Sequence, residues 1–380
     1  MRFKTDILSK HPRLAARVTR MTTAHGEIIT PAFMPVATRA YVNAMTVPDL
    51  IAAGSQIILG GNTYHMLCAP GMDVIQNAGG MHPFMQWQGP MLTDSGGFQI
   101  FSLSKNKKLC KIDEKGATFK HPHSGEKIRM TPTSSMETQR IIGADIIMAF
   151  DQCTSNEEDR AHVVNAMART HAWLRECKDY HVNHPQSHYG YFQALFGIIQ
   201  GGMFRDLREE SAAFIVSQDL DGIALGGETI GFDMQKTGDI LDWLLPIFPE
   251  NKPRYTMGVG LHPQNLIDAV AHGADMFDCV APTRNARHGA LYCGKIVKKG
   301  DWIVYEPEEE GDRLLIKKKI FEKDERPLAA SCTCYTCKHH TRAYLHYLFK
   351  TNAWLYHTLA SIHNVHVMHA VCLAMRESCN

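Results

Sequence analysis

Three aspartates that end or follow short apolar runs are the residues best suited to catalysis. They are Asp94 in LTDSGGFQ, Asp151 in IIMAFD and Asp278 in MFDCVAPTRNAR. A free aspartate has a pKa of about 3.9, so it is ionised at neutral pH and can act as a nucleophile without an activating base. Two carboxylates that face one substrate can serve as nucleophile and general acid/base, as in retaining glycoside chemistry.

The residues that follow two of these aspartates indicate a kind of substrate. Asp94 is followed at once by a serine and two glycines, which let a flat ligand approach the backbone closely. Asp278 is followed by Arg284 and Arg287. Two guanidinium groups a few residues beyond a carboxylate suit a phosphodiester with a reactive centre beside it.

The third carboxylate, Asp151, has a different potential use. One carboxylate can accept both the N–H and the NH₂ of guanine, while Gln200 or the backbone at Gly226 and Gly227 can meet the guanine carbonyl. A single aspartate at a strand end is as often a helix cap or half of a loop ion pair. Three of them in one fold favour a shared site.

A cysteine cluster near the C-terminus predicts a metal site. SCTCYTCKHH places Cys332, Cys334 and Cys337 in a C-x-C-x2-C pattern, which in a reducing compartment is typical of zinc. A closed tetrahedral site would hold structure and would not catalyse. Spacing leaves the fourth ligand open among His339, His340, His346, His357, His363, His366, His369 and Cys372.

Eight short apolar runs, each ending in a polar residue or glycine, predict how these residues are positioned. Runs without polar alternation are typical of parallel strands buried on both faces, and the gaps between them leave room for helices. The pattern predicts an α/β fold, a (β/α)₈ TIM barrel, whose chemistry lies at the carboxyl ends of the strands. The runs span 31–38, 56–62, 91–96, 145–151, 194–201, 222–227, 255–260 and 276–281.

Those strand ends supply a set of candidate site residues. They are Asn62, Asp94, Ser95, Asp151, Gln200, Gly226, Gly227, Met257, Gly258 and Asp278. The stretch 136–147 carries apolar residues at helical spacing, so we expect a packing helix there.

Bulk properties favour a globular cytoplasmic protein. The chain has 380 residues, which suits one barrel with insertions, and 44% of them are hydrophobic. No apolar stretch approaches about 20 residues and the N-terminus lacks an apolar signal region, so neither a membrane span nor secretion is expected. The net charge of +1 does not by itself indicate a nucleic-acid partner, although lysines crowd the segment 105–129.

Six motifs in order, spread over nearly the whole chain, resemble those of tRNA-guanine transglycosylases of the bacterial type (queuine tRNA-ribosyltransferases). They are DSGGFQ at 94–99, FDQCT at 150–154, FGIIQGG at 196–202, YTMGVG at 255–260, MFDCVAPTRNAR at 276–287, and CTCYTC followed by SIHN at 361–364. The family is a (β/α)₈ barrel with a C-terminal zinc-binding insertion. Its enzymes exchange a guanine in tRNA for a 7-deazaguanine in queuosine biosynthesis.

The resemblance implies a role for each matching residue. Asp278 would be the nucleophile that forms a covalent intermediate with ribose, and Asp94 the general acid/base. Ser95, Asp151, Gln200, Gly226, Gly227 and Met257 would bind the base, and Arg284 and Arg287 the tRNA anticodon loop. One structural Zn²⁺ per chain would be held by Cys332, Cys334, Cys337 and His363.

The same resemblance implies a single catalytic domain over 1–380, with the barrel at 30–300 and the zinc-binding subdomain at 325–370. We expect a homodimer that acts on the wobble guanine of U-G-U anticodons. The alternative is a non-catalytic tRNA-binding partner subunit, which the presence of both Asp94 and Asp278 disfavours.

One segment departs from the family pattern. After the sixth strand, many bacterial members have GGLAVGE, whereas this chain has GGETIGF at 226–232. Glu228 therefore replaces an apolar residue, and Phe232 stands where a glutamate is usual. We expect base recognition to be altered here or supplied by Glu228, with 7-aminomethyl-7-deazaguanine favoured over queuine.

Overall fold

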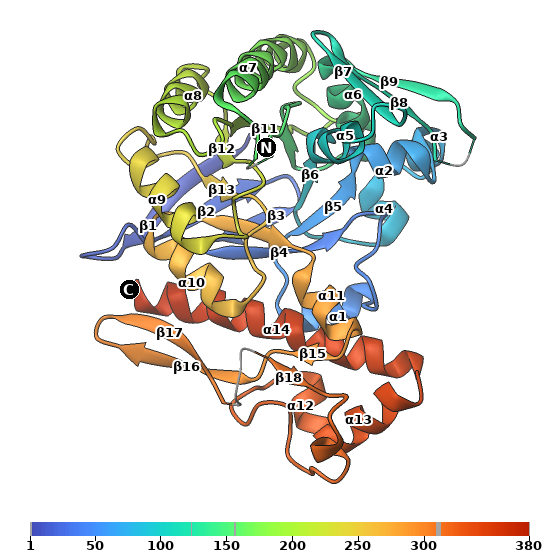
Figure 1. Cartoon of the computed structure of the whole chain (residues 1–380), viewed down its shortest axis with the longest axis vertical. Coiled ribbons are helices and arrows are strands. Elements are labelled where there is room, and N and C mark those ends of the chain that lie inside the picture. Colours follow the sequence, from blue (N-terminus) through green and yellow to red (C-terminus); the bar gives the residue numbers. More distant parts are fainter. Residues whose placement is uncertain (1, 123, 156, 309–312, 380) are drawn as a thin grey trace.

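The computed structural model describes residues 2–122, 124–155, 157–308 and 313–379, and its centre is a closed barrel of eight parallel strands (Figure 1). Each of the eight apolar runs forms one barrel strand, so the predicted (β/α)₈ fold is confirmed. In barrel order the strands are β4 (Ala32–Ala37), β5 (Ile58–Asn62), β6 (Met91–Asp94), β10 (Ile146–Met148), β11 (Ala194–Ile199), β12 (Gly222–Leu225), β13 (Arg254–Thr256) and β14 (Met276–Cys279), which pairs again with β4.

The barrel interior is a packed core. Met34, Leu92, Met148 and Phe196 point into one apolar cluster and are fully buried. Phe196 fits because the neighbouring strand offers Gly222, where a Cβ atom would lie 2.3 Å from the Phe196 ring. Large and small side chains therefore alternate between neighbouring strands, which is how a small barrel fills its centre.

Helices surround the barrel and connect its strands (Figure 1). The stretch 136–147 is not one helix as predicted: α6 ends at Ile142, Gly143 takes a left-handed φ of 77°, and β10 begins at Ile146. The connecting helices are α1 (Val47–Ala53), α2 (Thr63–Cys68), α3 (Met72–Asn77), α4 (Met81–Met85), α5 (Gly97–Ser104), α6 (Pro132–Ile142), α7 (Arg160–Asn183), α8 (Arg205–Ser217), α9 (Met234–Leu244) and α10 (Pro263–Ala271).

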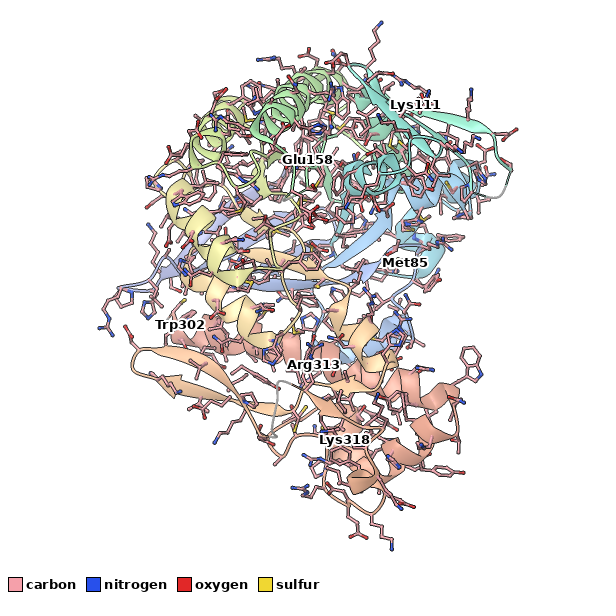
Figure 2. The ribbon with its side chains drawn as sticks, viewed as in Figure 1. Met85, Lys111, Glu158, Trp302, Arg313 and Lys318 are labelled. Atoms are coloured by element: carbon pink, nitrogen blue, oxygen red, sulfur yellow. The ribbon has the colours of Figure 1, made fainter. Side chains whose placement is uncertain are left out.

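Two small antiparallel sheets are added to the barrel. The first contains β1 (Lys4–Lys10), β2 (Arg17–Thr23) and β3 (Gly26–Ile29), and its Met21 and Ile28 pack into the interior cluster. The second contains β7 (Cys110–Asp113), β8 (Gly116–Lys120) and β9 (Lys127–Met130), and it carries the lysine-rich segment. Figure 2 shows its Lys111 at the opposite end of the molecule from Lys318, in the C-terminal region.

The C-terminal region follows α11 (Ala281–Arg287) and ends in the long helix α14 (Trp354–Ser378). The first half of α14 packs in a separate apolar cluster through Tyr356 and Leu359, and the second half joins the main core through Met368 and Val371. The elements between are β15 (Ala290–Leu291), β16 (Gly294–Lys299), β17 (Trp302–Pro307), β18 (Leu314–Leu315), the 3₁₀ helix η1 (Lys319–Phe321), α12 (Tyr335–His339) and α13 (Arg342–Lys350).

Among the described residues, α14 is the one helix long and apolar enough to cross a membrane. Within the protein, 67% of its most apolar window is buried, as in the core helix of a globular fold. The expectation of no membrane span stays a prediction.

Candidate active site and metal cluster

A cavity of about 550 Å³ opens at the carboxyl ends of the barrel strands. This is the end of a (β/α)₈ barrel at which catalytic groups gather. The cavity is lined by eleven of the predicted site residues, namely Asn62, Asp94, Ser95, Asp151, Gln200, Gly226, Gly227, Met257, Gly258, Asp278 and Arg284. Residues far apart in the sequence, from Asn62 to Arg284, thus meet in one place.

Asp278, on β14, is held firmly at one oxygen. The Tyr255 hydroxyl donates to its Oδ1 at 2.6 Å, and the Gly258 N–H donates to the same atom at 3.0 Å. Neither bond involves Oδ2. Burial raises the pKa of Asp278, and the two donors oppose that rise because they favour the ionised form. The two donors fix the orientation of the carboxylate.

Asp94 ends β6 and is surrounded by different donors. The side-chain amide of Asn62 donates to Oδ2, and the N–H groups of Thr63 and Gly96 donate to Oδ1 at 3.2 and 3.1 Å. Burial raises the pKa of Asp94 to about 7, and the nearby charge of Asp278 adds to the rise. A carboxyl with such a pKa can both give and take a proton near neutral pH.

Asp151 lies in the cavity wall with both oxygens bonded. The Ser95 hydroxyl donates to Oδ1 at 2.9 Å and the Gln200 amide donates to Oδ2 at 2.8 Å. Burial raises the pKa of Asp151 to about 6. A Cβ at Gly97 would lie 2.2 Å from Oδ1, so only glycine fits beside this carboxylate.

The segment that departs from the family pattern lies at the cavity rim. Glu228 lines the cavity and forms an ion pair with Lys105 at 3.3 Å, so it links the β12–α9 connection to α5. Phe98 and Phe232 also line the cavity, although their side chains are 54% and 70% exposed. The rim therefore offers one anionic group and two accessible aromatic faces.

The two arginines after Asp278 take different positions on α11. Arg284 is exposed and lines the cavity. Arg287 is not among the cavity-lining residues; it is partly buried, and its Nε donates to the Thr283 carbonyl at 3.2 Å. Only Arg284 is therefore brought to the mouth beside Asp278.

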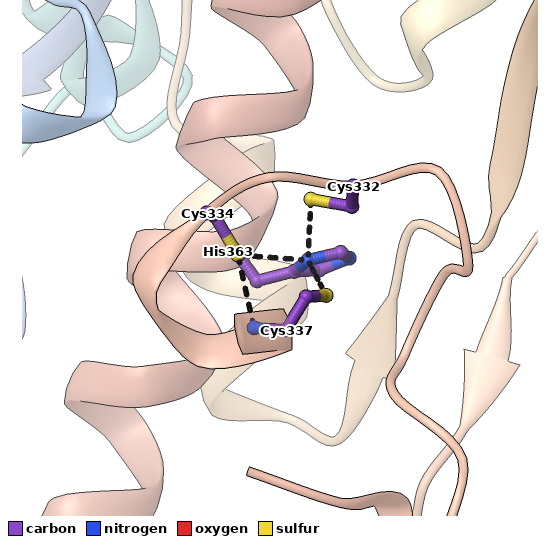
Figure 3. Close-up of side chains that lie close together, drawn as sticks. All are labelled: Cys332, Cys334, Cys337 and His363. Carbon is purple, nitrogen blue, oxygen red and sulfur yellow. Dashed lines mark hydrogen bonds between the residues drawn. The ribbon is translucent and has the colours of Figure 1, made fainter. Parts of the chain in front are cut away.

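A second cluster joins the predicted cysteines to α14 (Figure 3). The Sγ atoms of Cys332, Cys334 and Cys337 lie 3.6, 3.5 and 3.3 Å from Nδ1 of His363. Of the candidate fourth ligands that the sequence left open, His363 is the one in this cluster.

The geometry of this cluster fits a tetrahedral metal ion. Bonds of about 2.3 Å to sulfur and about 2.0 Å to nitrogen would separate S from N by about 3.5 Å. The Nε2 of His363 lies 2.7 Å from the Tyr292 carbonyl, which can only accept, so the ring proton is on Nε2 and the Nδ1 lone pair faces the sulfurs.

The sequence matches one family along almost its whole length. Residues 13–380 match the family profile described as queuine tRNA-ribosyltransferase. A queuine tRNA-ribosyltransferase of Synechococcus elongatus is 43% identical over 376 residues, which cover 99% of this chain and 91% of that protein. The protein of that name from Desulforamulus reducens is 41% identical over 378 residues, covering 100% and 94%. The one from Gloeobacter violaceus is 45% identical over 352 residues, covering 92% and 86%.

The chain belongs to the queuine tRNA-ribosyltransferase family. By that membership it is a pentosyltransferase.

Two residues of this family member were not found by sequence reasoning. Tyr255 lies in the middle of β13, the seventh barrel strand, and its hydroxyl donates to Asp278 on the next strand. Arg208 lies on α8, beneath the cavity floor, and contacts the ends of β11 and β12. Neither residue lies at the carboxyl end of a barrel strand, where the apolar runs place the candidate site residues. A polar residue inside an otherwise buried run was the only available signal for Tyr255, and Arg208 resembles any helix arginine in sequence.

Proposed function

We propose that this family member exchanges the wobble guanine of U-G-U anticodon tRNAs for a 7-deazaguanine, in queuosine biosynthesis. The observation that carries the proposal is the meeting of Asp94 and Asp278 in one cavity, with their carboxylates held by different donors. The two groups are suited to different tasks.

In the first half-reaction, Asp278 acts as the nucleophile. Its carboxylate forms a bond to C1′ of the ribose while the bond from C1′ to the purine nitrogen breaks, and the electron pair of that bond leaves with the purine. The hydrogen bonds from Tyr255 and Gly258 support this role because both end on Oδ1 and leave Oδ2 for the attack. The product is a covalent tRNA–enzyme ester and a departing guanine.

Asp94 manages the purine proton in both directions. Its carboxyl group donates a proton to the departing guanine, and its carboxylate then takes one from the incoming 7-deazaguanine. The incoming nitrogen attacks C1′ and Asp278 is released, so two displacements retain the configuration. A pKa of about 7 supports this double role, since both protonation states are populated at neutral pH.

Base recognition would use the wall opposite the ribose. Asp151 would accept the two N–H groups on one edge of guanine, and Gln200 and the Gly227 N–H would meet the carbonyl. All three lie in the cavity lining. The target base must leave the anticodon stack to reach them, which costs less in a loop than in a duplex. Arg284 at the mouth, and Arg287 behind it, are proposed to bind the loop backbone.

Glu228 supports an incoming base with a cationic 7-substituent, such as 7-aminomethyl-7-deazaguanine, over guanine, and we keep the preference for this base over the bulkier queuine as a proposal. An aminomethyl group is cationic at neutral pH, and the Glu228 carboxylate at the rim already pairs with one ammonium group, that of Lys105. A cationic substituent that reached the rim would replace the lysine in that pair.

We further propose that the metal is one structural Zn²⁺ per chain, bound by Cys332, Cys334, Cys337 and His363. Three thiolates and one imidazole are a donor set typical of closed zinc sites, and four protein ligands leave no open position for chemistry. We keep as proposals the single catalytic domain over 1–380, with the barrel at 30–300 and the zinc-binding subdomain at 325–370.

Cytoplasmic localisation and a homodimer are also proposed. Exposed aromatic side chains of the C-terminal region support a contact with a second copy: Tyr335, Tyr347 and Trp354 are 55%, 60% and 89% exposed.

The direct test is the covalent intermediate. Wild-type protein incubated with a U-G-U anticodon tRNA is expected to form an adduct that survives SDS, and to exchange labelled guanine. Asp278→Asn is expected to lose both while it still retards tRNA in a gel, with exchange reduced by at least about 10⁴-fold, as for other catalytic nucleophiles. Full exchange by Asp278→Asn would refute the mechanism. Wild-type protein that binds tRNA without adduct or exchange would instead favour the non-catalytic partner.

A further inference from the structure

Arg208 is a fully buried arginine directly beneath the cavity floor. Its side chain comes from α8 and has 0% exposure. Its Nε donates to the Gly202 carbonyl at 2.8 Å, and its Nη1 donates to the carbonyls of Ile199 and Gly226 at 3.0 and 2.8 Å. One guanidinium thus holds the carboxyl ends of β11 and β12 together.

Within the described ranges of the chain, no acidic side chain is hydrogen-bonded to Arg208. In the described part of the chain its hydrogen-bond acceptors are all backbone carbonyls, and Nη2 has no partner although it is buried. Burial lowers the pKa of Arg208 to about 10, which still leaves the group protonated at neutral pH. Burying an unpaired charge is costly, so its position beneath a ligand cavity calls for a ligand that repays the cost.

The peptide between Gly226 and Gly227 connects this charge to the cavity. Its carbonyl accepts from Arg208, and in a trans peptide the N–H points the opposite way. That N–H belongs to Gly227, which lines the cavity, and among the described residues it has no acceptor. A Cβ at Gly227 would lie 2.7 Å from Nη2, so the glycine also lets the guanidinium approach.

We propose that Arg208 is a positioning residue that acts through the Gly226–Gly227 peptide to stabilise negative charge on the 6-oxygen of the departing and incoming purine. This rests on the proposed function. When the bond to C1′ breaks, the electron pair moves onto the purine and part of the charge reaches its carbonyl oxygen. The guanidinium polarises the peptide, which makes the Gly227 N–H a stronger donor to that oxygen.

A purely structural role for Arg208 makes a different prediction. If Arg208 only holds β11 to β12, its replacement should reduce kcat/KM equally for every base. If Arg208 acts through the 6-oxygen, its replacement should reduce kcat/KM only for bases that carry this oxygen. The comparison therefore needs two bases: 7-deazaguanine, and 2-amino-7-deazapurine, which lacks the oxygen.

The experiment measures kcat/KM for incorporation of each base into tRNA by wild-type, Arg208→Lys and Arg208→Met. We expect kcat/KM of both variants to fall on the order of 30-fold with 7-deazaguanine and by less than about threefold with 2-amino-7-deazapurine. The first loss is smaller than that for direct removal of an oxyanion donor. The ratio of the two rates cancels any loss of folded protein. Arg205→Met, a change to an exposed arginine of the same helix, is expected to leave both rates unchanged.

Equal losses with the two bases would overturn the proposal. If the variants do not fold, the wild-type protein supplies a second measurement: the infrared C6=O stretch of bound 7-deazaguanine should lie below its value in water, and an unshifted stretch would also overturn it. Failure of wild-type protein to incorporate any base would refute the proposed function instead.

Discussion

At the residue scale, Asp94 and Asp278 show how identical side chains acquire different chemistry. Asp278 accepts hydrogen bonds from a phenol and a backbone N–H at a single oxygen, whereas Asp94 accepts hydrogen bonds at both oxygens. Burial raises the pKa of both carboxyl groups, that of Asp94 to about 7. The sequence could not distinguish the two roles, because both residues are aspartates at strand ends. The difference in hydrogen bonding comes from neighbours on other strands, Tyr255 for Asp278 and Asn62 for Asp94.

The raised pKa of Asp94 predicts a pH-dependent effect on stability. Its folded-state pKa of about 7 lies above the usual 3.8, so the folded protein holds the proton longer and loses stability as the pH rises through this range. We expect the free energy of unfolding of Asp94→Asn, relative to that of wild-type, to increase by on the order of 2 kcal/mol between pH 5 and pH 8. Urea unfolding of both proteins at the two pH values measures this. Parallel pH dependence would contradict it.

Glu228 predicts a change of base preference. Glu228→Gln is expected to raise KM for 7-aminomethyl-7-deazaguanine about 10-fold, the loss of one charge-assisted hydrogen bond, and to leave KM for guanine unchanged. Lys105→Met removes the competing cation, so it is expected to lower KM for the aminomethyl base. Steady-state incorporation of the two bases tests both variants, and equal effects on guanine and the charged base would argue against the assignment.

At the scale of elements, the barrel was predictable because burial of strands on both faces leaves a strong pattern. Each apolar run became a strand and its polar end came to the cavity. Contacts that depend on packing between distant segments left no such pattern. Arg208 reaches the ends of β11 and β12 only because α8 packs beside them, and Gly143 breaks an apolar stretch that was read as one helix.

Metal loss is expected to act mainly on the C-terminal region. Cys337→Ser should abolish binding of the proposed zinc ion and lower the free energy of unfolding by several kcal/mol, a share of the roughly 10–16 kcal/mol that zinc supplies to small zinc-finger domains. Hydrogen exchange should then speed up in 332–363, while β11 and β12 stay protected. Cys68→Ser, outside the cluster, serves as the control and should keep one zinc per chain by atomic absorption. Unchanged exchange in Cys337→Ser would refute a structural role.

At the scale of the whole molecule, α14 ties the metal cluster to the barrel. Its His363 faces the cysteines while Met368 and Val371 pack in the main core between the barrel and its helices, so one helix belongs to both regions. The family resemblance implied the zinc ligands. The spacing of apolar residues in 354–378 did not indicate that this helix would pack against both regions. A boundary at residue 370 therefore falls inside a continuous element.

The exposed N-terminal end of α14 predicts a contact between two chains. Trp354 is 89% exposed, and a tryptophan so exposed is unusual outside an interface. Light scattering is expected to give the mass of two chains, and Trp354→Ala should shift the equilibrium toward one chain at micromolar concentration. Leu373→Ala, 52% exposed on the same helix, should not. A wild-type mass of one chain would end this proposal.

The hydrogen bonds of Asp151 have a consequence for how fast a base can come and go. Ser95 and Gln200 each donate to one of the two carboxylate oxygens. An arriving purine must therefore share these oxygens with the protein's own donors or displace them, so its net gain in free energy per contact is small. Weak binding suits an enzyme that must release one base before it binds the next, because a base that stayed bound would stop the reaction at the covalent intermediate.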